Sequence, residues 1–232
     1  MNFSSNIYGL VKNTTYYIRA YAYNELGVSY SNQIECITLN KPDPVLETVK
    51  IGFQFWTSRN LDVSTYRNGE TIRHASTPQE WQDAASKGEG AWCYYDNDPK
   101  NGEMYGKLYN WYAVNDPRGL APEGYHIPSD AEWSVLTEYL GGEQIAGFKM
   151  KSTTGWANNG NGDNSSGFNG LPGGYCDGNG DFNNMSDYGS WWSSSENNSN
   201  GAWSRGLRGY NTKVLRYDDS KNYCFSVRCL RD

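Results

Sequence analysis

The sequence lacks the marks of several large classes of protein. The chain has 232 residues, only two of them histidine, and a formal net charge of −6. Binding to nucleic acid needs a basic surface, so the acidic balance argues against nucleic acid as the main partner. No run of about 18 apolar residues is present, so we expect no insertion into a membrane. No basic and apolar leader follows Met1, so we expect no signal peptide within this chain.

Motifs for catalysis are also scarce. Ser193, Ser194 and Ser195 have no neighbouring histidine that could activate a hydroxyl as a nucleophile. His126 stands just before a predicted helix start, where a hydrogen-bonded structural histidine is favoured over a catalytic one. We therefore expect a protein that is not an enzyme and has no cofactor.

Structural calcium stays open at two clusters of oxygen-bearing side chains. They are Asp-Asn-Asp at 96–98 and Asn-Gly-Asp-Asn at 161–164, and hard cations prefer such ligands. Neither cluster has the spacing of an EF-hand, and Asn and Asp in such runs more often form turns.

The five cysteines are odd in number and widely spaced, which argues against a disulfide framework or a zinc site. A Cys176–Cys224 bridge is left open. Cys229 ends a predicted buried strand at 225–229, and Cys224 directly precedes that strand. Because the two cysteines are five positions apart, their side chains are predicted to point to opposite faces. Cys229 is therefore predicted to be a small buried apolar residue.

Aromatic residues are abundant and make up 15% of the chain, with nine Trp and nineteen Tyr. Side chains of this size can fill a core in a chain with few aliphatic residues. The 26 glycines predict a domain rich in loops, the longest of them at 156–188.

Residues 1–40 have a character of their own. Two alternating β-runs joined by Asn24-Glu25-Leu26-Gly27 predict a hairpin. The segment resembles the last strands of a fibronectin type III domain, with Tyr16 placed like its tyrosine-corner residue. It is too short to close such a sandwich, so we interpret it as a truncated neighbour or as a hairpin that packs on the main domain. Its open edge can also seek a partner chain. Two prolines mark residues 41–46 as a linker.

Residues 47–232 predict an α+β domain. Thr77 and Ser129 each begin a capping box, with Glu80 and Glu132 three residues later, and so each predicts a helix start. We expect only these two helices, together with short strands such as 49–56 and long loops.

The segment from Asp187 to Cys224 has the composition of a binding loop. It is rich in Tyr, Ser, Gly, Asn and Asp, as antibody binding surfaces are, because rigid aromatic groups and adaptable polar groups together suit recognition. The candidate ligand-binding residues are Asn197, Asn198, Asn200, Trp203, Arg205, Arg208, Tyr210, Arg216, Tyr217, Asp218, Asp219 and Tyr223. A polar surface loop without a ligand is the alternative.

Several blocks, taken in order, resemble one known family. They are YGKLYNWYAV (105–114), LAPEGYHIPSDAEW (120–133), SGF with LPGG (166–174), WWSSSE (191–196) and FSVRCLRD (225–232). The order closely resembles the Fibrobacter succinogenes major paralogous domain, which is common in surface and secreted proteins of Bacteroidetes-type bacteria. The resemblance covers 47–232. It implies the C-type-lectin-like fold of formylglycine-generating enzymes, with two helices, a short mixed or antiparallel sheet and long loops.

The resemblance also implies a source of sequence variation. Some members of the family look like variable proteins of diversity-generating retroelements, in which error-prone copying of template adenines scatters substitutions over a C-terminal window. Here that window lies between fixed blocks at 191–192 and 225–229. Cys176 and Cys224 depart from the usual pattern.

The same resemblance raises one enzymatic alternative. Formylglycine-generating enzymes hold copper with two cysteines five apart, a spacing that Cys224 and Cys229 share. Cys229 lies in a segment that resembles the closing strand of those enzymes and not their redox pair. A copper oxidase of this type is therefore a remote alternative.

The favoured function is that of a ligand-binding module, adhesin-like or receptor-like. We expect it outside the cell or at the cell surface, with a protein or glycan ligand on a host, bacterial or phage surface. The competing hypothesis is a structural module of a larger cell-envelope protein with no ligand of its own. We also expect that oligomers can form through the N-terminal hairpin.

Overall fold

The computed structural model describes residues 7, 10, 14–38 and 46–232. The N-terminal part forms β1 (Thr15–Ile18) paired antiparallel with β4 (Ile34–Ile37), and β2 (Tyr21–Asn24) paired antiparallel with β3 (Gly27–Tyr30). The predicted hairpin is confirmed, since Asn24 accepts a hydrogen bond from the amide of Leu26 and Gly27 adopts a φ of 134°. Residues 41–45 of the predicted linker lie outside the described residues.

The remainder contains five α-helices. They are α1 (Pro78–Ser86), α2 (Pro99–Tyr105), α3 (Trp111–Val114), α4 (Asp130–Tyr139) and α5 (Glu143–Met150), with a short 3-10 helix, η1 (Tyr95–Asn97). Both predicted capping boxes are present, at Thr77 and Ser129. The expectation of only two helices is wrong. The additional helices α2 and α3 are 7 and 4 residues long, too short to show a hydrophobic period. Helix α5 begins at once after Gly142 and has no side-chain cap.

The strands are short except for three near the C-terminus. They are β5 (Thr48–Ile51), β6 (Gln54–Thr57), β7 (Arg73–His74), β8 (Ala91–Cys93), β9 (Leu108–Tyr109), β10 (Tyr125–His126), β11 (Tyr175–Cys176), β12 (Phe182–Asn183), β13 (Tyr188–Glu196), β14 (Gly201–Arg208), β15 (Leu215–Ser220) and β16 (Leu230–Arg231). The sheet orders are β10-β16-β6-β5, β7-β8-β9, β11-β12 and β13-β14-β15. The domain is α+β, as predicted.

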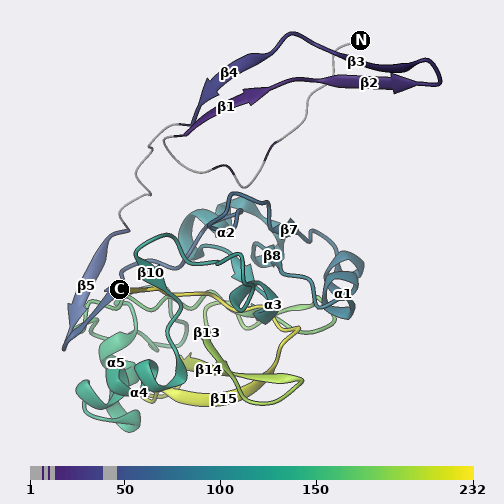
Figure 1. Cartoon of the computed structure of the whole chain (residues 1–232). Coiled ribbons are helices and arrows are strands. Elements are labelled where there is room, and N and C mark those ends of the chain that lie inside the picture. Colours follow the sequence, from purple (N-terminus) through teal and green to yellow (C-terminus); the bar gives the residue numbers. More distant parts are fainter. Residues whose placement is uncertain (1–6, 8–9, 11–13, 39–45) are drawn as a thin grey trace.

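The C-terminal segment differs from its predicted form in two places. Most of 187–224 is not a loop but the antiparallel sheet β13-β14-β15 (Figure 1). Conversely, the predicted strand at 225–229 is buried backbone that makes only isolated bridges, Tyr109 to Phe225 and Trp191 to Ser226. Only Leu230 and Arg231 form a strand there, paired with β10 at two register positions and with β6 at one.

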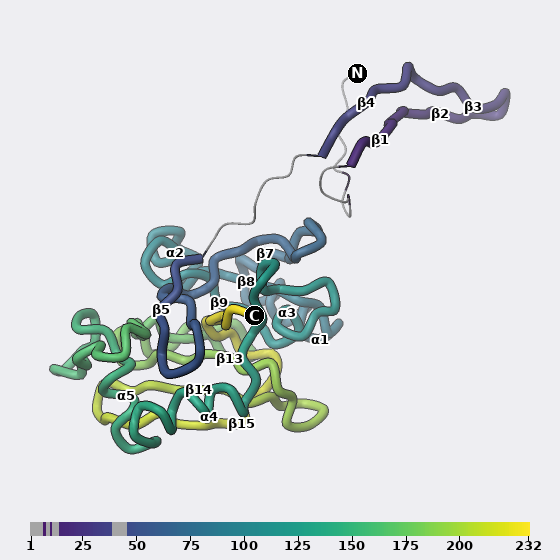
Figure 2. The backbone as a smooth tube through the Cα atoms, turned by 60° about the vertical axis from the view of Figure 1, so that its left-hand side comes forward, coloured from purple at the N-terminus to yellow at the C-terminus, as the bar shows by residue number. Residues whose placement is uncertain are grey.

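Tryptophans build much of the core, as the composition predicts. Trp56, Trp133 and Trp191 lie in one apolar cluster with Phe168, whose ring packs edge-on against all three. Trp192 points the other way from Trp191 into a second cluster. Helix α4 packs against β13 and β14, so one face of the three-stranded sheet is covered (Figures 1 and 2).

Candidate ligand-binding site

The predicted site residues divide between the two faces of the sheet β13-β14-β15. Side chains along a strand alternate between faces. On β14, Trp203 and Arg205 therefore lie on the face toward α4, and Ser204 and Arg208 lie on the opposite face. The register continues the division onto β15, where Arg205 pairs with Arg216 and Ser204 pairs with Tyr217.

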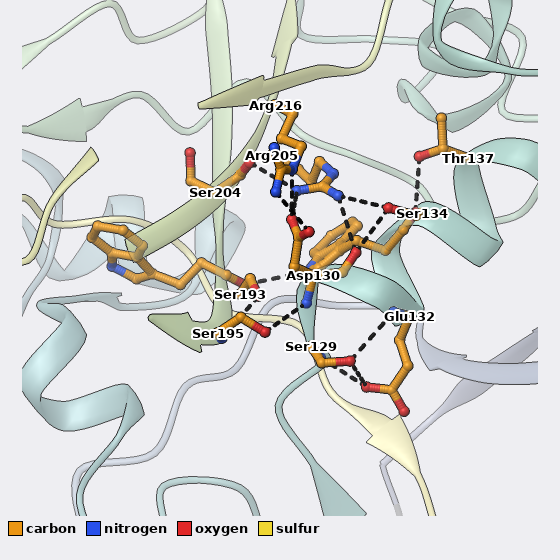
Figure 3. Close-up of polar contacts among 12 residues, drawn as sticks. Ser129, Asp130, Glu132, Ser134, Thr137, Ser193, Ser195, Ser204, Arg205 and Arg216 are labelled. Atoms are coloured by element: carbon orange, nitrogen blue, oxygen red, sulfur yellow. Dashed lines mark hydrogen bonds and ion pairs between the residues drawn. The ribbon is translucent and has the colours of Figure 1, made fainter. Parts of the chain in front are cut away.

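On the face toward α4, Asp130 binds two arginines at once. Its Oδ1 accepts from Arg205 Nη1 at 2.7 Å and from Arg216 Nε at 2.9 Å, and its Oδ2 accepts from Arg216 Nη2 at 2.9 Å (Figure 3). Burial by itself would raise the pKa of Asp130, but the hydrogen bonds from Arg216 and Arg205 outweigh it and hold that pKa below its usual value. The carboxylate is therefore charged and ties α4 to the sheet.

This network leaves little for a ligand to contact. Arg205 is only 3% exposed, and its Nη2 also donates to Ser134 Oγ at 3.2 Å. The guanidinium carbon of Arg216 lies 3.2 Å from the ring centroid of half-buried Trp203. Arg205 is thus enclosed by the fold, whereas Arg216 binds the same carboxylate and stays exposed at the surface.

The opposite face of the sheet carries a pocket of about 210 Å³. It brings together four of the predicted residues with four that were not predicted. The lining residues are Tyr175, Tyr188, Ser190, Arg208, Tyr217, Asp219, Tyr223 and Phe225.

Arg208 is the charged group at the centre of this pocket. It is 7% exposed, and its guanidinium carbon lies 3.9 Å from the ring centroid of Tyr188 and 5.2 Å from that of Tyr217. A Cβ on Gly206 would lie 2.7 Å from Arg208 Nη1, so glycine at that position makes room for the guanidinium. Nη1 donates to the carbonyl of Leu207 at 3.0 Å. Arg208 forms no ion pair with any of the described residues.

Three tyrosine rings form one wall. The ring of Tyr175 lies 6.4 Å from Tyr188 and 6.2 Å from Tyr223, with interplanar angles of 18° and 13°. Phe225 meets Tyr175 and Tyr223 edge-on. Sequence analysis missed Tyr175 because it lies twelve residues before the candidate segment, which begins at Asp187. The one available signal was its position next to Cys176, whose bridge to Cys224 had been left open.

Asp219 supplies the second charged group of the pocket. The half-buried carboxylate accepts a hydrogen bond from Ser204 Oγ. Burial raises the pKa of Asp219, against the opposing effects of the Ser204 hydrogen bond and the charge of Arg208. The carboxylate is consequently easier to protonate than a surface aspartate.

The remaining predicted residues do not line the pocket, and Asp218 pairs with Trp203 and so lies on the face toward α4. Tyr210 is 73% exposed, and its ring lies 6.4 Å from that of Tyr188. Asn197, Asn198 and Asn200 are exposed at the turn between β13 and β14. Asn198 forms that turn, because its Oδ1 accepts from the amides of Asn200 and Gly201 and its Nδ2 donates to Asp218.

Cys176 and Cys224 form a disulfide, so the bridge left open by the sequence is present. Their sulfurs and that of buried Cys93 all lie within 4.8 Å of one another, the one such group of potential metal ligands in the described part of the chain. Cys229 lies in a different apolar cluster from Cys224. The two cysteines with the copper spacing are therefore not brought together.

The clusters considered for calcium serve local structure. Asp98 Oδ1 accepts from the amide of Lys100 and caps α2. In the second cluster, Asp163 Oδ1 accepts from the amide of Ser165, and Asn164 Oδ1 accepts from the amide of Asn169. These bonds are those of turns and caps.

His126 has the structural role that the sequence favours. Its ring nitrogens lie 2.7 Å from Asp232 Oδ1 and 2.9 Å from Glu132 Oε1. Burial would lower the pKa of His126, but the hydrogen bonds to Asp232 and Glu132 raise it above its ordinary value.

A family model decides the broader assignment. The model described as the Fibrobacter succinogenes major domain matches residues 49–231. The chain belongs to this family. No curated protein and no solved structure matches the chain. The pocket lies wholly within the Fibrobacter succinogenes major domain, whereas strands β1–β4 precede it.

Over the described residues, none of the helices combines the length and the apolar character needed to cross a membrane.

Proposed function

We propose that this domain is a ligand-binding module, exposed at the cell surface or secreted, whose pocket on the sheet β13-β14-β15 recognises a protein or a glycan. The observation that carries the proposal is the pocket itself, with four tyrosines around a buried arginine that pairs with no acid among the described residues. Concave sites with aromatic walls and a few convergent polar groups are typical binding sites. Rigid tyrosines give contact area at small entropic cost.

The disulfide Cys176–Cys224 supports an extracellular location, because disulfides persist in oxidising compartments. The proposal includes a C-type-lectin-like scaffold. Support comes from the α+β architecture, the short strands and the long ordered stretches between β10 and β13, which agree with what the family resemblance implies.

The proposal also includes diversification of the C-terminal window. Six register pairs join β14 to β15, and the backbone ladder of an antiparallel sheet does not depend on which side chains its strands carry. Changes at Tyr217 and Asp219 on β15 therefore leave the strand pairing in place. Sequencing the gene in many sibling isolates tests this part. Substitutions concentrated between codons 197 and 224, at adenines, support it, whereas an even scatter along the gene contradicts it.

Binding is tested by capture on arrays of glycans and of surface proteins, using the complete chain. Tyr217→Ser should lose capture at the pocket while keeping the melting temperature nearly unchanged, because this side chain is 36% exposed. Tyr139→Ser on α4 is the matched control, since Tyr139 is also exposed and lies outside the pocket.

The competing hypothesis of a structural module gives the opposite result. In that case neither array gives specific capture, and Tyr217→Ser behaves like Tyr139→Ser. Capture that survives Tyr217→Ser would place the binding surface elsewhere on the molecule.

A further inference from the structure

The charged group of the pocket narrows the class of ligand. We infer that the pocket holds a sugar ring that bears a carboxylate, with Arg208 binding the carboxylate and the tyrosine rings packing against the C–H face of the sugar. This inference rests on the proposed ligand-binding function and specifies its ligand.

The first step is the contrast between Arg208 and other arginines of the chain. Arg205 and Arg216 bind Asp130, and Arg118 binds Asp116 and Glu70. Arg208 is nearly as buried as Arg205, yet no acid within the described residues comes to ion-pair distance from it. Buried Arg228 also lacks an acid, but its guanidinium donates to Asn60 Oδ1 and to the carbonyls of Thr57 and Asn169. The Arg208 guanidinium has only the Leu207 carbonyl as a hydrogen-bond partner among the described residues. A buried charge with so few partners is costly. An anion entering the pocket would remove that cost.

The second step is the geometry that a guanidinium offers. Arginine has five N–H donors in a planar fork that matches the two oxygens of a carboxylate. In Arg208, Nη1 donates to the carbonyl of Leu207, and the guanidinium carbon lies near the rings of Tyr188 and Tyr217. Its Nε and Nη2 donate to none of the described residues. Donors on the edge are thus available for a carboxylate.

The third step is the shape of the pocket. A volume of about 210 Å³ is below the range of about 300–1,000 Å³ that is usual for pockets of drug-sized ligands, which suits one ring rather than a long chain. The rings of Tyr175, Tyr188 and Tyr223 are nearly parallel, and all three line the pocket with apolar ring carbons and hydroxyl groups. A pyranose has a flat C–H face edged by hydroxyls, so it complements this wall, whereas the flexible side chain of a glutamate does not.

Asp219, the second charged group of the pocket, is compatible with an anionic ligand. The Asp219 carboxylate accepts a hydrogen bond from Ser204, and burial disfavours the charged form of Asp219. Its repulsion of a ligand carboxylate is therefore weaker than that of a solvated aspartate. The protonated form could also donate a hydrogen bond.

The experiment compares matched sugars in solution by titration calorimetry or ligand-observed NMR. The pairs are methyl glucuronide with methyl glucoside and methyl galacturonide with methyl galactoside, with N-acetylglutamate as the peptide-like carboxylate. We expect at least one acidic sugar to bind about tenfold or more tighter than its neutral partner, and N-acetylglutamate to bind weakly. Arg208→Gln should abolish the preference, and Arg208→Lys should restore it only in part, since lysine lacks the fork.

Arg231→Gln is the matched control, because it removes the same charge from an exposed site outside the pocket and should leave the preference intact. Equal binding of acidic and neutral sugars would overturn the inference, as would tighter binding of N-acetylglutamate. The inference is also overturned if no sugar of the matched pairs binds in solution while the arrays show capture of neutral glycans or of proteins. In that case the proposed ligand-binding function still stands. Failure of both the arrays and the titrations would reject the two together.

Discussion

Tyr175 and Tyr223 stack with their ring centroids 6.2 Å apart, and the residue that follows each of them is one half of the Cys176–Cys224 disulfide. The bridge joins residues 48 positions apart in sequence. The covalent bond therefore fixes the separation of two aromatic groups that line the same pocket. The same bridge therefore affects both the stability of the domain and the arrangement of the pocket.

Replacing both bridge cysteines, Cys176→Ser with Cys224→Ser, should destabilise the domain by about 2–4 kcal/mol, because the unfolded chain regains the freedom that the bridge removes. The urea midpoint measures this. Binding by the remaining folded protein should also weaken, since Tyr175 and Tyr223 are no longer held together. Cys93→Ser is the control: Cys93 is equally buried but has a free thiol, and its change should preserve binding. Full binding by the double variant would contradict the role assigned to the bridge.

Asp130→Asn should destabilise the fold by about 2–4 kcal/mol, since it leaves buried Arg205 without its acid. Denaturant titration checks the effect, and Glu138→Gln, an exposed change on the same helix, should have little effect. The folded-state pKa of Asp130 is lowered. The stabilisation that Asp130 gives the folded state is therefore fully present at pH values above the pKa of Asp130 in the unfolded chain. It is lost as the pH falls through the lower pKa of Asp130 in the folded state. A variant as stable as the wild type at pH 7 would show that the network contributes nothing.

Gly206→Ala should weaken binding of acidic sugars several-fold, because the new Cβ would meet the Arg208 guanidinium at 2.7 Å and displace it. The loss of stability should be about 1 kcal/mol, because the displaced group is the far end of a flexible side chain. Gly209→Ala is the matched control, because the nearest atoms to its Cβ lie 3.6 Å away. Calorimetric titration compares the two variants, and equal effects would argue against a positioned guanidinium.

His126→Gln should remove part of the pH dependence of stability. The folded-state pKa of His126 is raised, so the stabilisation is complete below the unfolded value of about 6.5 and is lost as pH rises through the folded value. The group is partly exposed, and the effect should not exceed about 1 kcal/mol. Thermal melts from pH 5 to about 9 test this. A wild type and variant whose melting temperatures differ by a constant amount over that range would contradict it.

The sequence predicted local structure correctly where residues close together in the chain determine it. The helix starts at Thr77 and Ser129 follow from capping boxes whose partners lie three residues away, and the hairpin at Asn24 follows from its turn residues. Short helices such as α3 were not predicted, because a single helical turn is too short to show a hydrophobic periodicity. The sheet β13-β14-β15 was not predicted, because its serine, glycine and arginine residues give it the composition of a loop.

The sequence alone determined the family and the α+β class, and it predicted a C-terminal segment whose candidate residues include four of the eight pocket residues. It could not determine which arginine of that segment serves the fold and which faces the pocket. Arg205 and Arg208 are three positions apart on one strand, so they point to opposite faces, and the packing of α4 on one face gives Arg205 its acid. Tertiary structure also brought Tyr175 to Tyr223, because contacts across 48 residues depend on how the chain folds back and not on its local pattern.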